Sequence, residues 1–229
     1  PLWMRYCAIS PDGTTIAFTY KGDIYTVPST GGRASQITTN PAHDTKPIWS
    51  PDGKKIAFAS DRMGSMDIFE VNKEGGIPKR LTTHSGNETP VAYKDAGHIL
   101  FLANIMPTAE DAQFPSGQFQ QVYEVNTEGG RPILFSSMPM EDISINHTGN
   151  TLLYHDKKGY EDPWRKHHTS SITRDIWLCS LNGNRTFRKQ TAFNGEDRTP
   201  VWASDDKSFY YLSEEKGSFN IFKRDIDGN

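Results

Sequence analysis

The sequence predicts an all-β fold, a β-propeller built from four-stranded antiparallel blades. Three observations lead to this prediction: one stretch recurs five times, each copy contains short runs of alternating polar and apolar residues, and Gly, Asp and Asn separate the runs. The runs have the period of strands, with no helical period. Because one four-stranded sheet has two apolar faces and cannot cover them alone, repetition around a common axis is expected.

Size and composition are those of a globular protein. At 229 residues the chain suffices for one large all-β domain or two smaller ones, and we expect a single propeller domain or segment over residues 1–229. The net charge of -3 gives no overall basic field for nucleic acid or anionic lipid. No apolar run approaches the roughly 18 residues of a membrane helix, and PLWMRYCAIS lacks the regions of a signal peptide. The chain is therefore expected to be cytosolic or to have lost its leader.

The two clearest copies of the repeat, ISPDGTTIAF (Ile9–Phe18) and WSPDGKKIAF (Trp49–Phe58), align without a gap, and their turns are 40 residues apart. In SPDG, Pro presets φ, Asp bonds its own backbone and Gly accepts positive φ. We therefore interpret Asp12 and Asp52 as turn residues and not as catalytic carboxylates. Weaker copies follow at intervals of 43, 53 and 58 residues: YKDAGHILF from Tyr93, NHTGNTLLY from Asn146 and SDDKSFYY from Ser204.

A second alternating run follows each copy and begins with a polar, a β-branched and an aromatic residue. After a further turn, the first four copies continue with a short run such as PKRLTT (Pro78–Thr83) or RKQTAF (Arg188–Phe193). The first strand of the next unit then begins, as in KPIWS or TPVWAS, so that each unit holds four strands. The five matching starts are Asp23-Ile24-Tyr25, Asp67-Ile68-Phe69, Gln121-Val122-Tyr123, Asp175-Ile176-Trp177 and Asn220-Ile221-Phe222.

The repeat places the blades at approximately 5–39, 45–84, 88–137, 141–193 and 198–229. The fifth unit has three of its four strands, so we expect four full blades and most of a fifth, belonging to a longer propeller. A five-bladed ring completed by N-terminal residues is the alternative. Cys7 falls on a predicted innermost strand and Cys179 on a predicted third strand, so both are expected to be free thiols.

The repeat SPDGKKIAFASDRMGSMDIFEVNKEGGIPKRLT resembles the TolB-type (PD40, WD40-like) propeller repeat. The whole chain resembles the N-terminal propeller of bacterial tricorn-like proteases, which are S41-type serine peptidases. The stretches that carry this resemblance are PLWMRYCAISPDGTTIAFTYKGDIYTVPSTGG, HHTSSITRDIWLC (His167–Cys179) and GEDRTPVWASDDKSFYYLSEEKGSFNIF (Gly195–Phe222).

The resemblance implies a propeller of six or seven blades, followed by a PDZ module and a catalytic module bearing Ser, His and Glu. Neither module falls within these residues, and no position matches the family's catalytic motifs, so no catalytic residue is assigned. The resemblance also implies a periplasmic or secreted location.

Two units contain insertions between their second and third strands, ANIMPTAEDAQFPSGQFQ (Ala103–Gln120) and HDKKGYEDPWRKHHTSSITR (His155–Arg174). Because strands alternate in direction, both insertions are expected on the propeller face that carries the connections between blades. Loops on rigid scaffolds often carry function, and aromatic and basic residues anchor peptides or partner domains. The alternative is that the insertions only pack against protein. The candidate binding residues are Phe114, Phe119, Tyr160, Trp164, Arg165, Lys166, His167 and His168.

No cofactor, metal or nucleic acid is expected. His167 and His168 lack an evident third ligand, and WRKHH is too short and isolated to recognise nucleic acid.

Function is therefore expected to be recognition. The expected function is a non-catalytic propeller segment that selects or channels peptides toward a catalytic module elsewhere in a serine peptidase. Expected partners are peptides or unfolded polypeptide, the remaining domains of the parent protein and a possible second copy of the chain. The alternatives are a TolB-like scaffold that binds a protein partner, and the propeller of a prolyl-oligopeptidase-like enzyme, which predicts a G-x-S-x-G motif downstream.

Overall fold

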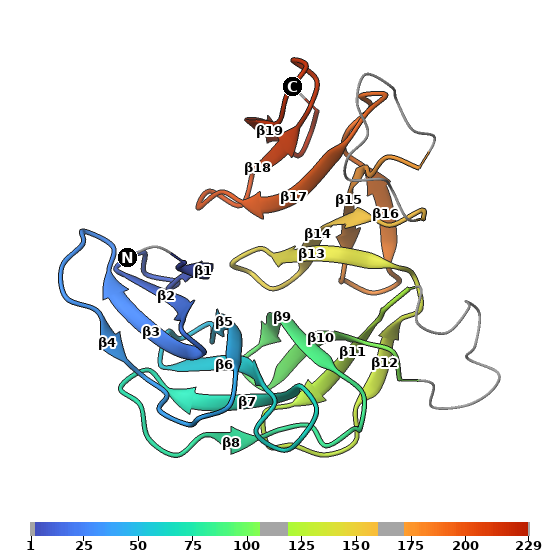
Figure 1. The fold of residues 1–229 in the computed structure, drawn as a ribbon. Coiled ribbons are helices and arrows are strands. Elements are labelled where there is room, and N and C mark those ends of the chain that lie inside the picture. Colours follow the sequence, from blue (N-terminus) through green and yellow to red (C-terminus); the bar gives the residue numbers. More distant parts are fainter. Residues whose placement is uncertain (1–2, 106–118, 160–171, 229) are drawn as a thin grey trace. The chain divides into compact units, whose positions relative to one another are not determined.

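The computed structural model describes residues 3–105, 119–159 and 172–228. Within these ranges the protein consists of antiparallel strands, with no helix, arranged in five sheets (Figure 1). Four sheets have four strands and the last has three. The predicted fold class, an all-β propeller of four full blades and most of a fifth, is confirmed.

The chain divides into two compact units, and the first comprises Pro1–Ser137. It holds three sheets in which the strands follow one another in sequence order. The strands of the first sheet are β1 (Arg5–Ile9), β2 (Thr15–Tyr20), β3 (Asp23–Pro28) and β4 (Ser35–Gln36). The second sheet has β5 (Asp44–Trp49), β6 (Lys55–Ser60), β7 (Asp67–Asn72) and β8 (Lys79–Arg80), and the third has β9 (Glu88–Asp95), β10 (His98–Ala103), β11 (Gln121–Asn126) and β12 (Ile133–Ser136).

The second unit comprises Met138–Asn229 and holds the other two sheets. The fourth sheet has β13 (Met140–Ile145), β14 (Thr151–Asp156), β15 (Ile176–Ser180) and β16 (Thr186–Lys189). The fifth has β17 (Asp197–Trp202), β18 (Ser208–Ser213) and β19 (Asn220–Asp225). Cys7 and Cys179 are both free thiols, as expected.

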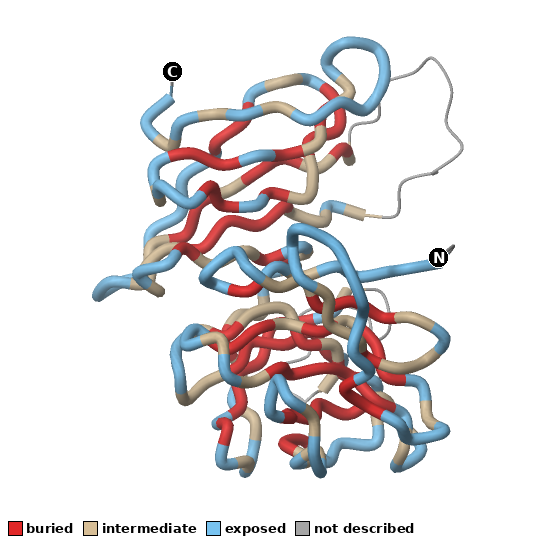
Figure 2. Tube along the Cα trace, turned by 90° about the vertical axis from the view of Figure 1, so that its left-hand side faces the viewer, coloured by how far each residue is buried: buried red, intermediate tan, exposed pale blue. Residues whose placement is uncertain are grey.

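Within each unit the first strands of successive sheets contact one another, β1 with β5, β5 with β9, and β13 with β17. These are therefore the innermost strands. Buried residues follow the strands, while the turns are largely exposed (Figure 2). In the first unit Ile24 of one sheet packs with Trp49 and Phe58 of the next. Ile176 packs in the same way against Trp202 and Phe209 in the second unit. Each sheet thus covers a face of its neighbour.

The SPDG turns form as their residues predict. Asp12 Oδ1 accepts hydrogen bonds from the Ser10 hydroxyl at 2.6 Å and from the Thr14 amide at 3.0 Å, and Gly13 has a φ of 72°. These bonds, led by the one from Ser10, lower the pKa of Asp12 to about 2. Asp52 bonds Ser50 in the same way at 2.7 Å. Turn geometry accounts for both carboxylates.

The fourth strands are shorter than the sequence predicts. The run Pro78–Thr83 forms a strand only at Lys79–Arg80. Beyond it the Leu81 amide donates to the Ile68 carbonyl at 2.8 Å, but the Ile68 amide donates to the Thr82 hydroxyl at 2.9 Å. A threonine side chain therefore replaces a backbone carbonyl and ends the ladder. The Ile24 and Ile176 amides bond Thr38 and Thr191 in the same way.

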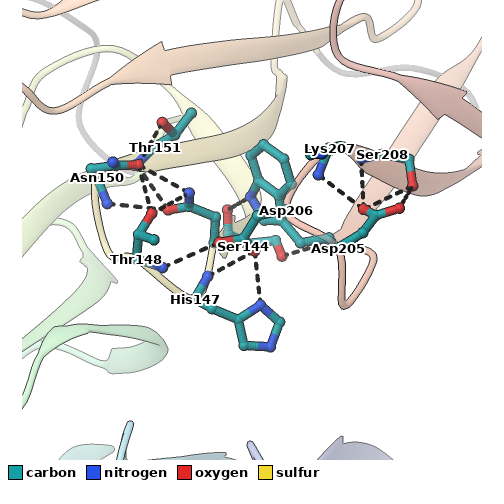
Figure 3. Close-up of polar contacts among 11 residues, drawn as sticks. Ser144, His147, Thr148, Asn150, Thr151, Asp205, Asp206, Lys207 and Ser208 are labelled. Atoms are coloured by element: carbon teal, nitrogen blue, oxygen red, sulfur yellow. Dashed lines mark hydrogen bonds and ion pairs between the residues drawn. The ribbon is translucent and has the colours of Figure 1, made fainter.

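Two turns of the second unit are joined through Asp206 (Figure 3). Its Oδ1 accepts a hydrogen bond from the His147 amide at 3.0 Å and lies 2.8 Å from His147 Nδ1, and its Oδ2 accepts from the Thr148 amide at 3.3 Å. Asp206 occupies the turn position of Gly13 and has a φ of 52°. Because Asp tolerates left-handed backbone better than most residues, this turn gains a side chain that links it to the preceding blade.

The β-branched position of the third strand shows how much burial depends on the next sheet. Ile24, Ile68 and Ile176, each followed by another sheet in its own unit, are 0% exposed, whereas Ile221 of β19 is 74% exposed. Three other apolar side chains of the fifth sheet are also exposed: Val201, Tyr210 and Phe219.

We expect Ile176→Ala to lower the free energy of unfolding by about 2–5 kcal/mol, because it leaves a cavity between two sheets. The matched change Ile221→Ala should cost less than about 0.5 kcal/mol, because that side chain is in water. Urea unfolding of both variants measures the difference. Equal losses would contradict this account of the packing.

Candidate functional site

All five innermost strands contain a β-bulge near their start, and four of these bulges share one feature. The strand pairing shifts between Arg5 and Ala8 in β1, and the corresponding shifts occur in β5, β13 and β17. One residue in each of these four bulges has a left-handed backbone: φ is 55° at Tyr6, 53° at Lys46, 49° at Asp142 and 56° at Thr199.

Left-handed backbone at a bulge normally selects Gly, because a Cβ atom there costs about 1–2 kcal/mol. None of the four residues is Gly, and Thr is also β-branched. Strain of this kind is often found where a side chain has to be aimed for function. The bulges therefore identify the innermost strands of each unit as candidate binding surfaces.

The third innermost strand differs because of proline. The residue of β9 that corresponds to Lys46 is Pro90, whose ring holds φ near -65°. The pairing of β9 shifts between Pro90 and Ala92 and again between Tyr93 and Asp95, and no residue of β9 has a positive φ. β9 therefore offers no left-handed side chain.

Within each unit the two bulge side chains contact each other. In the first unit Lys46 Nζ lies 5.7 Å from the centre of the Tyr6 ring, within the range of a cation–π interaction. In the second unit the Thr199 hydroxyl donates a hydrogen bond to Asp142 Oδ2 at 2.8 Å. Tyr6 is 49% exposed and the Asp142 side chain 51%. Each unit thus presents an adjoining pair of polar side chains that solvent can reach.

A buried histidine supports the bulge of β17. His155 Nδ1 accepts a hydrogen bond from the Thr199 amide at 3.2 Å, so a neutral ring carries its proton on Nε2. Nε2 lies 3.3 Å from Glu141 Oε2, and Lys157 Nζ lies 2.7 Å from Glu141 Oε1. The hydrogen bond from His155 and the charge of Lys157 lower the pKa of Glu141 to about 2, although burial opposes the shift. Glu141 is therefore a carboxylate at neutral pH.

The basic residues that flank the blade-four insertion are paired with acids. Lys158 Nζ contacts Asp175 and donates to the Thr173 carbonyl at 2.7 Å. Arg174 Nη1 lies 2.6 Å from Glu196 Oε1. These pairs hold both ends of the insertion, so their charges are partly neutralised before any ligand arrives.

The ends of the blade-three insertion are held by a tyrosine and by apolar packing. The Tyr123 hydroxyl donates to Gln121 Oε1 at 2.7 Å and also contacts the Ile105 carbonyl. Ile105 packs against the core that contains Phe101 and Tyr123. One tyrosine therefore ties together the two ends of this insertion.

Both insertions leave their sheets where predicted, between β10 and β11 and between β14 and β15, at the end where the innermost strand begins. Among the predicted binding residues only Phe119 is described; it is half-buried. That the two insertions share one face stays a prediction. The other predicted residues lie outside the described ranges: Phe114, Tyr160, Trp164, Arg165, Lys166, His167 and His168.

The bulge residues were not predicted from the sequence. Their alignment gives no usable signal, because the position before the bulge residue varies in chemistry as much as the bulge position does. The bulge position holds Tyr6, Lys46, Pro90, Asp142 and Thr199.

In the part of the chain that the structure describes, no group of three or more His, Cys, Asp or Glu side chains could hold a metal ion. The same residues include no helix that is long and apolar enough to cross a membrane.

The sheets and their converging innermost strands define the class of the protein, a β-propeller. Residues 1–229 match the tricorn protease N-terminal β-propeller domain, and the chain belongs to this family. It is 25% identical to tricorn protease homolog 1 of Streptomyces coelicolor, over 100% of this chain but 20% of that protein. It is 33% identical to an uncharacterized protein of Agrobacterium fabrum, over 89% of this chain and 68% of that protein.

Solved structures show the same fold. The chain is similar to the tricorn protease with a TM-score of 0.72 and 20% identity, over 99% of this chain and 22% of that one. For TolB from Acinetobacter baumannii the TM-score is 0.69 and the identity 17%, over 99% of this chain and 52% of that one. The chain thus spans about one fifth of the length of the tricorn homologues, which contain other domains.

We expect Lys46→Gly to change the free energy of unfolding by less than about 1 kcal/mol. Glycine removes the cost of the left-handed backbone, which offsets its greater entropy in the unfolded chain. The control Ile48→Gly, two residues further along β5 and packed against the core, should cost more than about 2 kcal/mol. Urea unfolding gives both values. A large loss at Lys46 would show that its side chain serves stability.

Proposed function

We propose that this propeller is a non-catalytic part of a tricorn-like serine peptidase that selects or channels peptides toward a catalytic module outside this chain. The single observation that carries the proposal is the set of strained, non-glycine residues on the innermost strands of a chain in the tricorn N-terminal propeller family. Strands of packed sheets hold such side chains more rigidly than loops do.

The chemistry of the bulge residues suits an extended peptide. Lys46 offers a positive charge and Asp142 a negative one, and Thr199 and Tyr6 add a hydroxyl and an aromatic ring. These groups bind peptide carbonyls, amides and termini without requiring one sequence. In this proposal the insertions add aromatic and basic contacts from Phe114, Phe119, Tyr160, Trp164, Arg165, His167 and His168.

The test uses the full-length parent protein and two fluorogenic peptides, one short and one long. Lys46→Gly combined with Asp142→Gly should change kcat/KM for the long peptide by about fivefold or more, the factor expected for a lost contact worth about 1 kcal/mol. The short peptide should be cleaved as before. Deletion of residues 160–168 tests the insertion in the same assay. Unchanged turnover of both peptides by both variants would remove the case for channelling.

A second candidate is a TolB-like scaffold that binds a protein partner and is not attached to an enzyme. It is favoured by the Agrobacterium fabrum relative, of which this chain covers 68%, so that a propeller makes up most of that protein. The coding sequence after residue 229 distinguishes the candidates. A PDZ-like and serine-peptidase region supports the first, its absence supports the second, and a G-x-S-x-G motif would indicate a prolyl-oligopeptidase-like enzyme.

A further inference from the structure

Carboxyl groups recur in pairs where one sheet meets the next. One member of each pair stands at the start of a third strand, and the other begins the innermost strand of the following sheet. Within each pair burial raises the pKa of one member, and the negative charge of the other member adds to the shift. The pairs are Asp23 with Asp44, Asp67 with Glu88, and Asp175 with Asp197.

In each pair one member binds a cation. Asp44 is 0% exposed, and Arg62 Nη2 lies 2.9 Å from its Oδ1 and 3.0 Å from its Oδ2. Asp175 is bound by two lysines, Lys189 at 2.9 Å and Lys158.

The pair of Asp67 and Glu88 is different in its burial, because both side chains are 0% exposed. Arg80 Nη2 lies 2.8 Å from Asp67 Oδ2. Among the described residues, no Lys, Arg or His nitrogen lies within 4.0 Å of a Glu88 oxygen, and neither oxygen has a hydrogen bond of good geometry. An ionised Glu88 would therefore be a buried and uncompensated charge, which is strongly unfavourable.

We propose that Glu88 is a neutral carboxylic acid in the folded protein, and that its ionisation loosens the contact between the second and third sheets. The groups that face the pair come from three segments. Asp67 lies at the start of β7, Arg80 lies in β8, and His84 follows β8 and acts on Asp67. The Thr82 hydroxyl is close to Glu88 but carries no charge.

The electrostatics agree with this geometry. Burial, aided by the charge of Asp67, raises the pKa of Glu88 to about 7 from its usual 4.5, although Thr82 opposes the shift. Burial also raises the pKa of Asp67, against the charge of Arg80.

Ionisation of Glu88 would weaken hydrogen bonds that join two segments of the first unit, the β6–β7 connection and the β8–β9 connection. The Glu88 amide donates to the Met66 carbonyl at 2.7 Å, and the Met66 amide donates to Asn87 Oδ1 at 3.1 Å. The Ser65 hydroxyl donates to the His84 carbonyl at 3.1 Å. A second negative charge beside Asp67 would push apart the strand ends that these bonds hold together.

The direction of the pH dependence follows from proton linkage. Between pH 4.5 and about 7 the folded protein keeps the Glu88 proton and the unfolded chain releases it. The contribution of Glu88 to stability is therefore complete below this window and is lost as the pH rises through it, by up to about tenfold in the unfolding equilibrium constant per pH unit.

The test compares urea unfolding at pH 5 and pH 8 for the wild type, Glu88→Gln and the control Glu128→Gln, a change at an exposed carboxylate of the same unit. Glutamine imitates the neutral acid. Relative to Glu88→Gln, the wild type should become less stable by on the order of 100-fold in the equilibrium constant between the two pH values. Glu128→Gln should follow the wild type.

An identical pH dependence of Glu88→Gln and the wild type would overturn the proposal. So would recovery of wild-type stability at pH 8 on addition of Ca²⁺ or Na⁺, since a cation would then replace the proton. If Glu88→Gln does not fold, the side-chain carboxyl ¹³C resonance of Glu88 in the wild type decides. A titration midpoint near 7 supports the proposal, and one near 4.5 contradicts it.

Discussion

The structure depends on one constraint, that a small twisted sheet has two apolar faces and too few residues to cover either. Within each unit the solution is the same: the third-strand Ile of one sheet lies against an aromatic residue of the next innermost strand, as Ile24 does against Trp49 and Ile68 against Tyr93. The arrangement of sheets, the convergence of their first strands and the rigidity of the surface those strands present all follow from it. A position with identical chemistry can be fully buried or mostly exposed according to whether a neighbouring sheet is present, as Ile176 and Ile221 are.

Polar groups occupy the junctions that the apolar faces create, and there the repeats have diverged most. One junction carries an arginine on its buried aspartate, another carries two lysines, and the junction of Asp67 and Glu88 carries an arginine on Asp67. These junctions are therefore different ways of accommodating a carboxyl group between two sheets. The innermost strands also differ in chemistry at the position where four of them have a left-handed backbone.

Most of the fold could be predicted from the sequence because it is built from local properties. Alternation with period two, the SPDG turns and the β-branched third-strand position all reside in neighbouring residues. The shortness of β8 could not be predicted, because it depends on the Thr82 hydroxyl reaching the Ile68 amide. The bulge at Lys46 escaped prediction for a related reason. Nothing in lysine favours a positive φ, which follows from the register between β5 and β6. The network around His155 joins strands separated by more than forty residues, so no local sequence pattern predicts it. The positions of the two insertions between strands were predicted correctly. Of the predicted contact residues, Phe119 alone falls within the described residues.

The shortness of the fourth strands affects how readily the protein can pair with strands of other molecules. β4 and β8 each offer a rim only two residues long, and β8 consists of Lys79 and Arg80. A strand of another molecule could form few backbone hydrogen bonds with an edge of two residues, and the charges of β8 would repel a basic strand. Because edges this short offer few free backbone groups, the fourth strands of the first two sheets protect the protein from pairing with strands of other molecules when it is concentrated.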